Sequence, residues 1–265
     1  MHWLADALAA GFPLRQGLAL LALSTLRFAA GRALFKLELP MKLRLYAPLS
    51  YLPEVVRNVL HVFFYRDYEA LSRFRPREGW IVADVGAFIG VYTVRAAKLV
   101  GPGGRVVAVE PLPDHVELAA LNAAANSLAN VRIVEACASD RWGEAELLVP
   151  PSPINATLKP EYAEAAEGVK ARKRVRLVPL DALLEAEGPL DLLKVDVEGY
   201  ELDLLRGSKL LAPRYARRLV VEAHTNVAPS ALVARELERR GYATAVYLPE
   251  GAHEQAFVYA FVSEN

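Results

Sequence analysis

A short loop carries the clearest chemical signal in the sequence. It reads Asp84-Val85-Gly86-Ala87-Phe88-Ile89-Gly90 and stands between an apolar run at 80–85 and a helical stretch at 91–99. Its two glycines allow the backbone to approach a ligand closely, and the helix that follows offers free N–H groups in its first turn. A strand end of this kind opens into the crevice where parallel sheets bind ligands. We therefore expect cofactor contacts at Asp84, Gly86, Ala87, Phe88, Gly90, Tyr92 and Thr93.

Glu110 and Asp84 indicate which ligand this loop binds. Glu110 ends the next apolar run, where a carboxylate can accept hydrogen bonds from both hydroxyls of a ribose. The loop lacks the third close glycine of the dinucleotide fingerprint, and the sequence has no GxxxxGK[ST] segment. Asp84 would repel a pyrophosphate but attract a cationic amino group. These features favour S-adenosylmethionine over NAD, ATP or GTP.

Four side chains near the ends of two later apolar runs are candidates for catalysis. Asp196 and Glu198 stand two residues apart, and Glu222 and His224 repeat that spacing. In an extended segment, side chains two residues apart point to the same face, so each pair should line the crevice. A hydroxyl that accepts a methyl group must also lose its proton, and a base within hydrogen-bond reach speeds that step.

These four residues admit three interpretations. In the first, His224 or Asp196 is a general base, with Glu198 and Glu222 as further candidates. In the second, Asp196 and Glu198 cap the turn at Gly199, and catalysis rests on position alone. In the third, oxygen ligands and His224 hold a divalent cation. We take Asp196, Glu198 and His224 as the catalytic residues, with Asp196 also near the cofactor, and expect no metal.

The ends of two other apolar runs complete the expected site. Cys137, Ala138 and Ser139 follow the third run, where their backbone could meet the adenine. Lys194 lies inside an apolar run, so it should reach an acidic partner or the mouth of the crevice. The only cysteine, Cys137, excludes an intramolecular disulfide and a CxxC metal cluster, and we expect it to be a small buried apolar residue. A chain without disulfides suits the cytoplasm.

The elements that must position these residues follow a regular alternation of apolar and helical stretches. Alternation of this type predicts an α/β fold with a doubly wound, Rossmann-like, mostly parallel sheet. A final pair of runs at 243–248 and 256–262 indicates an antiparallel C-terminal hairpin. An extra strand pair is expected at 144–149 and 173–179. The five parallel strands are predicted at 80–85, 105–109, 131–136, 191–197 and 218–223.

The N-terminal part of the sequence lacks this regular alternation. We expect residues 1–75 to form a mainly helical extension, including one helix over 14–35, and residues 76–265 to form the cofactor-binding domain. The uncharged stretch at 16–26 is far shorter than the roughly 18 to 20 residues that span a bilayer, although the helix could contact a membrane surface. Residues 1–80 carry 11 Lys and Arg against 6 Asp and Glu, in a chain of zero net charge.

Several motifs together resemble one known family. The loop at 84–90 is followed by Glu110-Pro111, by Lys194-Val195-Asp196-Val197-Glu198-Gly199-Tyr200-Glu201 and by Leu205-Arg206-Gly207. This set is similar to the FkbM family of class I S-adenosylmethionine-dependent methyltransferases, over about residues 65–262. The resemblance implies O-methylation of a sugar or small metabolite. Where the family usually has Asn, this chain has Phe88, which removes one polar contact near the methionine end of the cofactor.

Two other classes of function stay open. The basic N-terminal part and the cations at 170–176 would suit an enzyme that modifies RNA, since cations bind phosphates. A scaffold that keeps the cofactor pocket without catalysis is the other class. The chain also has only two Gln, two Met and one Cys, and scarcity of these labile residues is one trait of heat-adapted, thermophilic proteins.

Overall fold

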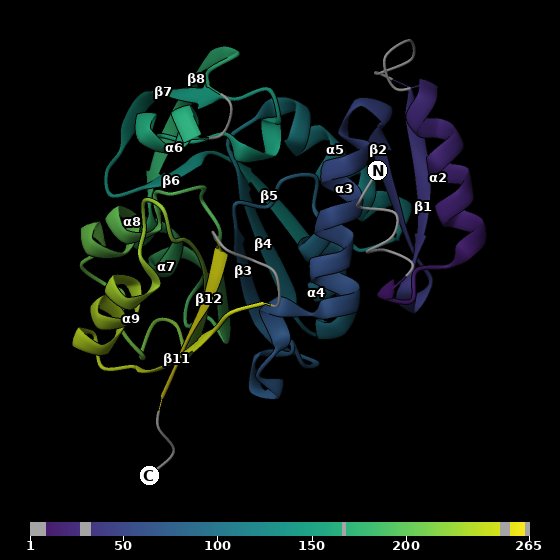
Figure 1. Ribbon diagram of the computed structural model, residues 1–265. Helices are drawn as coiled ribbons and strands as arrows, with labels where there is room; N and C mark the ends of the chain where they lie inside the picture. The colour runs from purple at the N-terminus through teal and green to yellow at the C-terminus, as the bar shows by residue number, and fades with distance from the viewer. Residues whose placement is uncertain (1–8, 27–32, 166–167, 250–254, 263–265) are drawn as a thin grey trace.

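The computed structural model describes residues 9–26, 33–165, 168–249 and 255–262 (Figure 1). At its centre is a seven-stranded sheet in which β12 is antiparallel to both neighbours and the other pairs between β10 and β5 are parallel. This arrangement confirms the predicted mostly parallel sheet with an antiparallel C-terminal pair. The strand order is β11 (Ala243–Tyr247), β12 (Gln255–Phe261), β10 (Arg218–His224), β9 (Leu192–Val195), β3 (Ile81–Val85), β4 (Arg105–Glu110) and β5 (Val131–Glu135).

Helices cover both faces of this sheet, and the strands are apolar on both sides for that reason. Successive side chains of β3 show the alternation: Val82 packs into one buried cluster and Ala83 into the other. Figure 1 shows one group of helices on each side of the sheet. One face has α4 (Val91–Val100) and α5 (Pro113–Ala125), and the other has α7 (Leu180–Glu187), α8 (Glu201–Gly207) and α9 (Ser230–Arg239).

A small separate sheet interrupts the alternation between β5 and β9. The predicted extra pair is confirmed as antiparallel β7 (Gly143–Val149) and β8 (Ala171–Pro179), and β6 (Cys137–Ser139) adds to β8 in parallel. Two short helical elements lie between β7 and β8, η6 (Pro153–Asn155) and α6 (Pro160–Ala165).

The N-terminal segment contains a hairpin that the sequence analysis did not predict. Helix α2 (Leu14–Leu26) is followed by the antiparallel strands β1 (Leu34–Leu39) and β2 (Leu43–Pro48), so the single helix expected over 14–35 is wrong in its last residues. In β1 buried and exposed side chains alternate strictly, as in a strand with one buried face. The next elements are α3 (Leu52–Val59) and the π-helical turn η3 (Leu60–Tyr65), and short 3₁₀ turns lie at η1 (Pro40–Lys42), η2 (Leu49–Tyr51), η4 (Asp67–Glu69) and η5 (Ser72–Phe74).

This segment and the sheet share one hydrophobic core. Leu45 and Val59 of the segment belong to the same buried cluster as Val106 of the sheet. The buried Arg95 of α4 donates two hydrogen bonds of 2.7 Å to Glu69 of η4. The boundary predicted between residues 75 and 76 therefore crosses a continuous core. Among the residues that the structure describes, every helix is too short or too polar to span a bilayer.

Candidate active site

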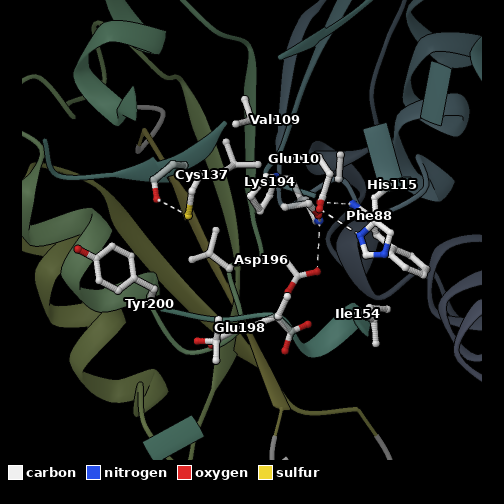
Figure 2. Close-up of a pocket in the computed structure, with 18 of the residues that line it drawn as sticks. Phe88, Val109, Glu110, His115, Cys137, Ile154, Lys194, Asp196, Glu198 and Tyr200 are labelled. Atoms are coloured by element: carbon white, nitrogen blue, oxygen red, sulfur yellow. Dashed lines mark hydrogen bonds and ion pairs between the residues drawn. The ribbon is translucent and has the colours of Figure 1, made fainter. Parts of the chain in front are cut away.

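A pocket opens at the carboxyl ends of β3, β4 and β9 (Figure 2). It has a volume of about 770 Å³, counting the part that is open to solvent. The loops after these strands meet β6 and the N-terminal segment there, so elements distant in sequence share one cavity. The predicted site residues that line it are Gly86, Ala87, Phe88, Tyr92, Glu110, Cys137, Ala138, Asp196 and Glu198. Asp84, Gly90, Thr93, Ser139 and His224 lie outside its lining.

Asp84 lies beneath the pocket and has other partners. It is fully buried, accepts a hydrogen bond of 2.6 Å from Thr93 Oγ1, and lies 3.1 Å from Lys194 Nζ. Lys194 Nζ also lies 3.2 Å from Asp196 Oδ2, as Figure 2 shows. This lysine therefore has two acidic partners, which confirms the expected ion pair. Burial opposes the charge of Lys194, but Asp84 and Asp196 outweigh it and raise its pKa. A direct contact between Asp84 and a ligand amino group stays a prediction.

The glycine loop is held against the loop after β9. A side chain at Gly86, where φ is +80°, would place its Cβ only 1.6 Å from the carbonyl oxygen of Asp196. Lys194 Nζ donates a hydrogen bond of 2.7 Å to the Gly86 carbonyl. The first glycine is therefore required by the close approach of two backbones, which brings the Asp196 side chain to the pocket wall.

Glu110 already has several donors at the pocket wall. Its carboxylate accepts hydrogen bonds from the backbone N–H groups of Phe88 at 2.9 Å and Leu112 at 3.1 Å, and it lies 3.1 Å from His115 Nδ1. A carboxylate has about four acceptor positions. About one is left for a ribose hydroxyl, so a bond to both hydroxyls would require His115 to turn away. The predicted ribose contact stays a prediction.

The pocket wall fits S-adenosylmethionine because it presents polar atoms that have no partner within the described part of the chain. Tyr92 OH, His115 Nε2 and Asp196 Oδ1 are buried and have no hydrogen-bond partner within the described ranges. All three residues line the pocket. The amino group, ribose and adenine of S-adenosylmethionine carry both donors and acceptors, so the residues present suit this cofactor.

A second pocket of about 470 Å³, including space open to solvent, adjoins the first. The two share Asn58, Tyr68, Ile154, Asp196 and Glu198 in their walls. The other residues of the second pocket are Glu54, Arg57, His61, Asn155, Glu222 and Gln255. The boundary between the pockets is therefore the place where a substrate would meet a bound cofactor.

Tyr68 lines both pockets, and its partner Glu222 lines the second. The Tyr68 hydroxyl donates a hydrogen bond to Glu222 Oε2 and lies 3.2 Å from Asp196 Oδ2. Burial, and then the charge of Asp196, raise the pKa of Glu222 to about 7, against the opposing effects of His224, Tyr68 and His61. A carboxylate that exchanges its proton near neutral pH is suited to act as a general base.

His224 lies behind the carboxylates rather than in a pocket wall. Its Nδ1 lies 2.8 Å from Glu201 Oε1, and its Nε2 lies 3.2 Å from Glu198 Oε2. Burial lowers the pKa of His224, but Glu198 and Glu201 outweigh it and raise the pKa well above the usual value. A protonated imidazole between two glutamates holds the loop after β9 in place. That His224 or Glu198 acts as a base stays a prediction.

One set of described residues has the spacing of metal ligands. Asp196, Glu201 and His224 each place one ligand atom within 4.8 Å of the others. Glu201 Oε1, however, already accepts a hydrogen bond of 3.0 Å from the Gly199 N–H and contacts His224. Lys194 Nζ also lies 3.2 Å from Asp196 Oδ2, so all three residues take part in a network of hydrogen bonds and ion pairs, and the expectation of no metal stays a prediction.

Several site residues escaped the sequence analysis. They are four residues of the N-terminal segment, for which we predicted a mainly helical extension and named no site residue: Glu54, Asn58, His61 and Tyr68. The available signal was the presence of polar residues within the apolar stretch 52–68. Conversely, three of the five cations at 170–176 have acceptors: Arg172 pairs with Glu146 at 2.5 Å, Arg174 pairs with Glu144, and Arg176 donates a hydrogen bond of 3.0 Å to the carbonyl of Glu135.

Comparison with known proteins places this site in a family. The family model for the methyltransferase FkbM domain matches residues 84–243. Methyltransferase sdnD of Sordaria araneosa is 30% identical, over 53% of this chain and 65% of sdnD. A probable cobalt-precorrin-6B C(15)-methyltransferase of Sulfurisphaera tokodaii is 31% identical, over 51% of this chain and 70% of that protein. The chain thus spans slightly under two thirds of the length of sdnD.

Solved structures resemble the chain at low identity. Precorrin-6y C5,15-methyltransferase from Geobacter metallireducens superposes with a TM-score of 0.48 at 18% identity, covering 76% of this chain and 90% of that one. A SAM-dependent methyltransferase from Aquifex aeolicus gives 0.44 at 19%, covering 74% and 89%. The family match includes the glycine loop, Glu110 and the residues after β9 and β10. The chain therefore belongs to the FkbM methyltransferase family, and S-adenosylmethionine is its methyl donor.

Proposed function

We propose that this methyltransferase transfers the methyl group to a hydroxyl oxygen of a sugar or another small polar metabolite. The main support for this proposal is the position and pKa of Glu222, a buried carboxylate with a pKa of about 7 that lines the second pocket. An unprotonated amine or an ionised thiol can accept a methyl group without help from a protein base. A hydroxyl reacts much faster when a base removes its proton. The polar lining of the second pocket suits a hydroxylated acceptor.

Each residue of the site then has a defined task. The unpartnered Asp196 Oδ1 receives the cofactor amino group, while Lys194 holds Oδ2 and so fixes the carboxylate. Glu110 accepts a hydrogen bond from a ribose hydroxyl. Tyr68 orients Glu222, which takes the proton as the acceptor oxygen bonds to the methyl carbon. Bound S-adenosylmethionine supplies an activated methyl group whose bonding pair to sulfur stays on sulfur, so a neutral thioether leaves.

The other classes of function receive less support. The cations of β8 that would bind RNA phosphates are mostly engaged by Glu144, Glu146 and the Glu135 carbonyl. A scaffold would have no need for a carboxylate with a pKa near neutral in the wall of the second pocket. We place the activity in the cytoplasm, because the chain has one cysteine and that thiol is buried.

Calorimetric titration with S-adenosylmethionine tests the cofactor site. We expect binding in the micromolar range, about −8 kcal/mol, and at least about tenfold weaker binding for Asp196→Ala and for Glu110→Ala. Glu117→Ala changes an exposed carboxylate on α5 and should bind like the wild type. Unchanged affinity in both site variants would remove the assignment. Release of S-adenosylhomocysteine with hydroxylated acceptors then tests the transfer, and methylation of RNA alone would contradict the proposal.

A further inference from the structure

The second pocket is built largely by residues outside the matched family domain. Glu54, Arg57 and Asn58 belong to α3 and His61 to η3, whereas the family match begins at residue 84. The carboxylates of Asp196 and Glu198, which follow β9, and of Glu222, in β10, also line the pocket. The N-terminal segment therefore forms one side of the place where the acceptor binds.

The charges in this pocket are mostly negative. Its lining has the carboxylates of Glu54, Asp196, Glu198 and Glu222, against Arg57 and the imidazole of His61. Two buried cations lie behind the lining: Lys194 is held by Asp84 and Asp196, and His224 is held by Glu198 and Glu201. Because each of them has two carboxylate partners, they do not reverse the negative charge of the pocket. Like charges repel strongly where water is partly excluded. An acceptor that carries a phosphate or carboxylate is disfavoured, and one that carries a cation is favoured.

Glu54 has an acceptor atom that the protein does not satisfy. Its Oε1 receives a hydrogen bond of 3.3 Å from Ser152 Oγ, while its Oε2 is buried without a partner within the described part of the chain. A buried carboxylate oxygen without a donor costs free energy, and a donor from a ligand would recover it. Glu54 is not used in the proposed methyl transfer, so this oxygen is available for recognition.

We infer that the second pocket selects acceptors that carry a protonated amine besides their hydroxyls, with Glu54 as the partner of the ammonium group. This inference rests on the proposed function, because the same pocket must present the reacting hydroxyl to Glu222. The ammonium is bound and keeps its protons; the hydroxyl is the group that is methylated. Acceptors of the amino-polyol class meet both requirements, since the amine supplies charge and the hydroxyls supply donors.

Three matched polyols test this inference: glucamine, sorbitol and sorbitol 6-phosphate. They share one carbon skeleton and differ in a protonated amine, a hydroxyl and a phosphate. Binding is measured by ligand-observed NMR titration at about pH 8, where a primary amine is still protonated and Glu222 is ionised. The protein is first saturated with S-adenosylhomocysteine. We expect glucamine to bind at least about tenfold more tightly than sorbitol, and sorbitol 6-phosphate most weakly.

A substitution identifies the residue responsible. In Glu54→Gln the affinity for glucamine should fall about tenfold, towards that of sorbitol, while the affinity for sorbitol changes little. Glu117→Gln on α5 is the matched control, because its carboxylate is exposed and outside the pocket. Glu54 also lies in the first turn of α3, so thermal melting of both variants separates a loss of recognition from a loss of helix stability.

The outcomes distinguish this inference from the proposed function. Equal binding of glucamine and sorbitol, tighter binding of the phosphate, or no binding of glucamine by cofactor-loaded protein would each overturn the amine assignment. An unchanged glucamine preference in Glu54→Gln would overturn the role of Glu54. Failure of S-adenosylmethionine to bind at all would instead contradict the proposed function, which the calorimetric titration decides beforehand.

Discussion

Glu222 and Asp196 are two carboxylates in one site whose surroundings give them different tasks. Asp196 forms an ion pair with the ammonium of Lys194, whose Nζ lies 3.2 Å from its Oδ2. Glu222 has the hydroxyl of Tyr68 as its nearest partner, and burial dominates. The surroundings thus distinguish the two groups: Asp196 is held by an ion pair with Lys194, whereas Glu222 can exchange a proton near neutral pH.

The rate of methyl transfer should therefore depend on pH through Glu222. Below about pH 7 this group is protonated and cannot accept the proton of a hydroxyl, so the rate should rise between about pH 6 and pH 8 and then level off. In Glu222→Gln we expect kcat to fall at least about 10²-fold and the rise to disappear. S-adenosylhomocysteine formation across this range measures both. A variant that keeps the wild-type pH profile would exclude Glu222 as the base.

Cys137 gives a second prediction for a single residue. Burial, and then the charge of Glu110, raise the pKa of its thiol to about 12, so almost no thiolate is present at neutral pH. Because the thiolate is the reactive form, alkylation by iodoacetamide should be far slower in the native protein than in urea. Mass spectrometry of timed samples checks this. Rapid labelling of the native chain would contradict a buried thiol at the pocket wall.

At the scale of elements, the loop after β3 and the loop after β9 form one unit. Gly86→Ala places a methyl group against the Asp196 carbonyl in a backbone conformation that disfavours side chains. We expect a loss of at least about 3 kcal/mol in the free energy of unfolding, because neither backbone can move without displacing a strand end. Urea denaturation followed by circular dichroism measures it.

Gly103→Ala is the control for that substitution. A Cβ at Gly103 would meet no heavy atom within 4 Å, and its φ is outside the positive range. The free energy of unfolding should change by less than about 0.5 kcal/mol. If both variants were equally stable, the requirement for glycine at position 86 could not be explained by the contact between the two loops.

Elements with strong local patterns were predictable from the sequence, and elements defined by contacts were not. The runs around Ala83 and Val107 gave correct strands because a sheet covered on both faces makes its strands continuously apolar. Strand β1 was missed because the helix expected over 14–35 took in its first two residues and no strand was predicted over the rest. We expected Asp84 to pair with a ligand and did not predict that Lys194 would be its partner. The two residues become neighbours only when β3 and β9 pair in the folded sheet.

At the scale of the whole molecule, the N-terminal segment completes the site and shares the core of the sheet. Asn58 and Tyr68 line the pocket, and Phe74 packs against Tyr259 of β12 with ring centroids 4.7 Å apart. Sequence periodicity could not reveal this, because contacts between distant segments leave no local repeat. The family match from residue 84 onwards therefore describes the cofactor side of the site, and the segment before it supplies much of the acceptor side.

Arg95→Met tests whether the segment and the sheet unfold as one unit. The substitution leaves Glu69 buried without its bidentate partner, which should lower the free energy of unfolding by about 3 to 5 kcal/mol. Arg235→Met changes an exposed arginine on α9 and should have little effect. Because the core is continuous, we expect one urea transition that coincides by circular dichroism and tryptophan fluorescence. Two separate transitions in Arg95→Met would mean that the segment folds independently and that its wall of the acceptor pocket can detach from the sheet.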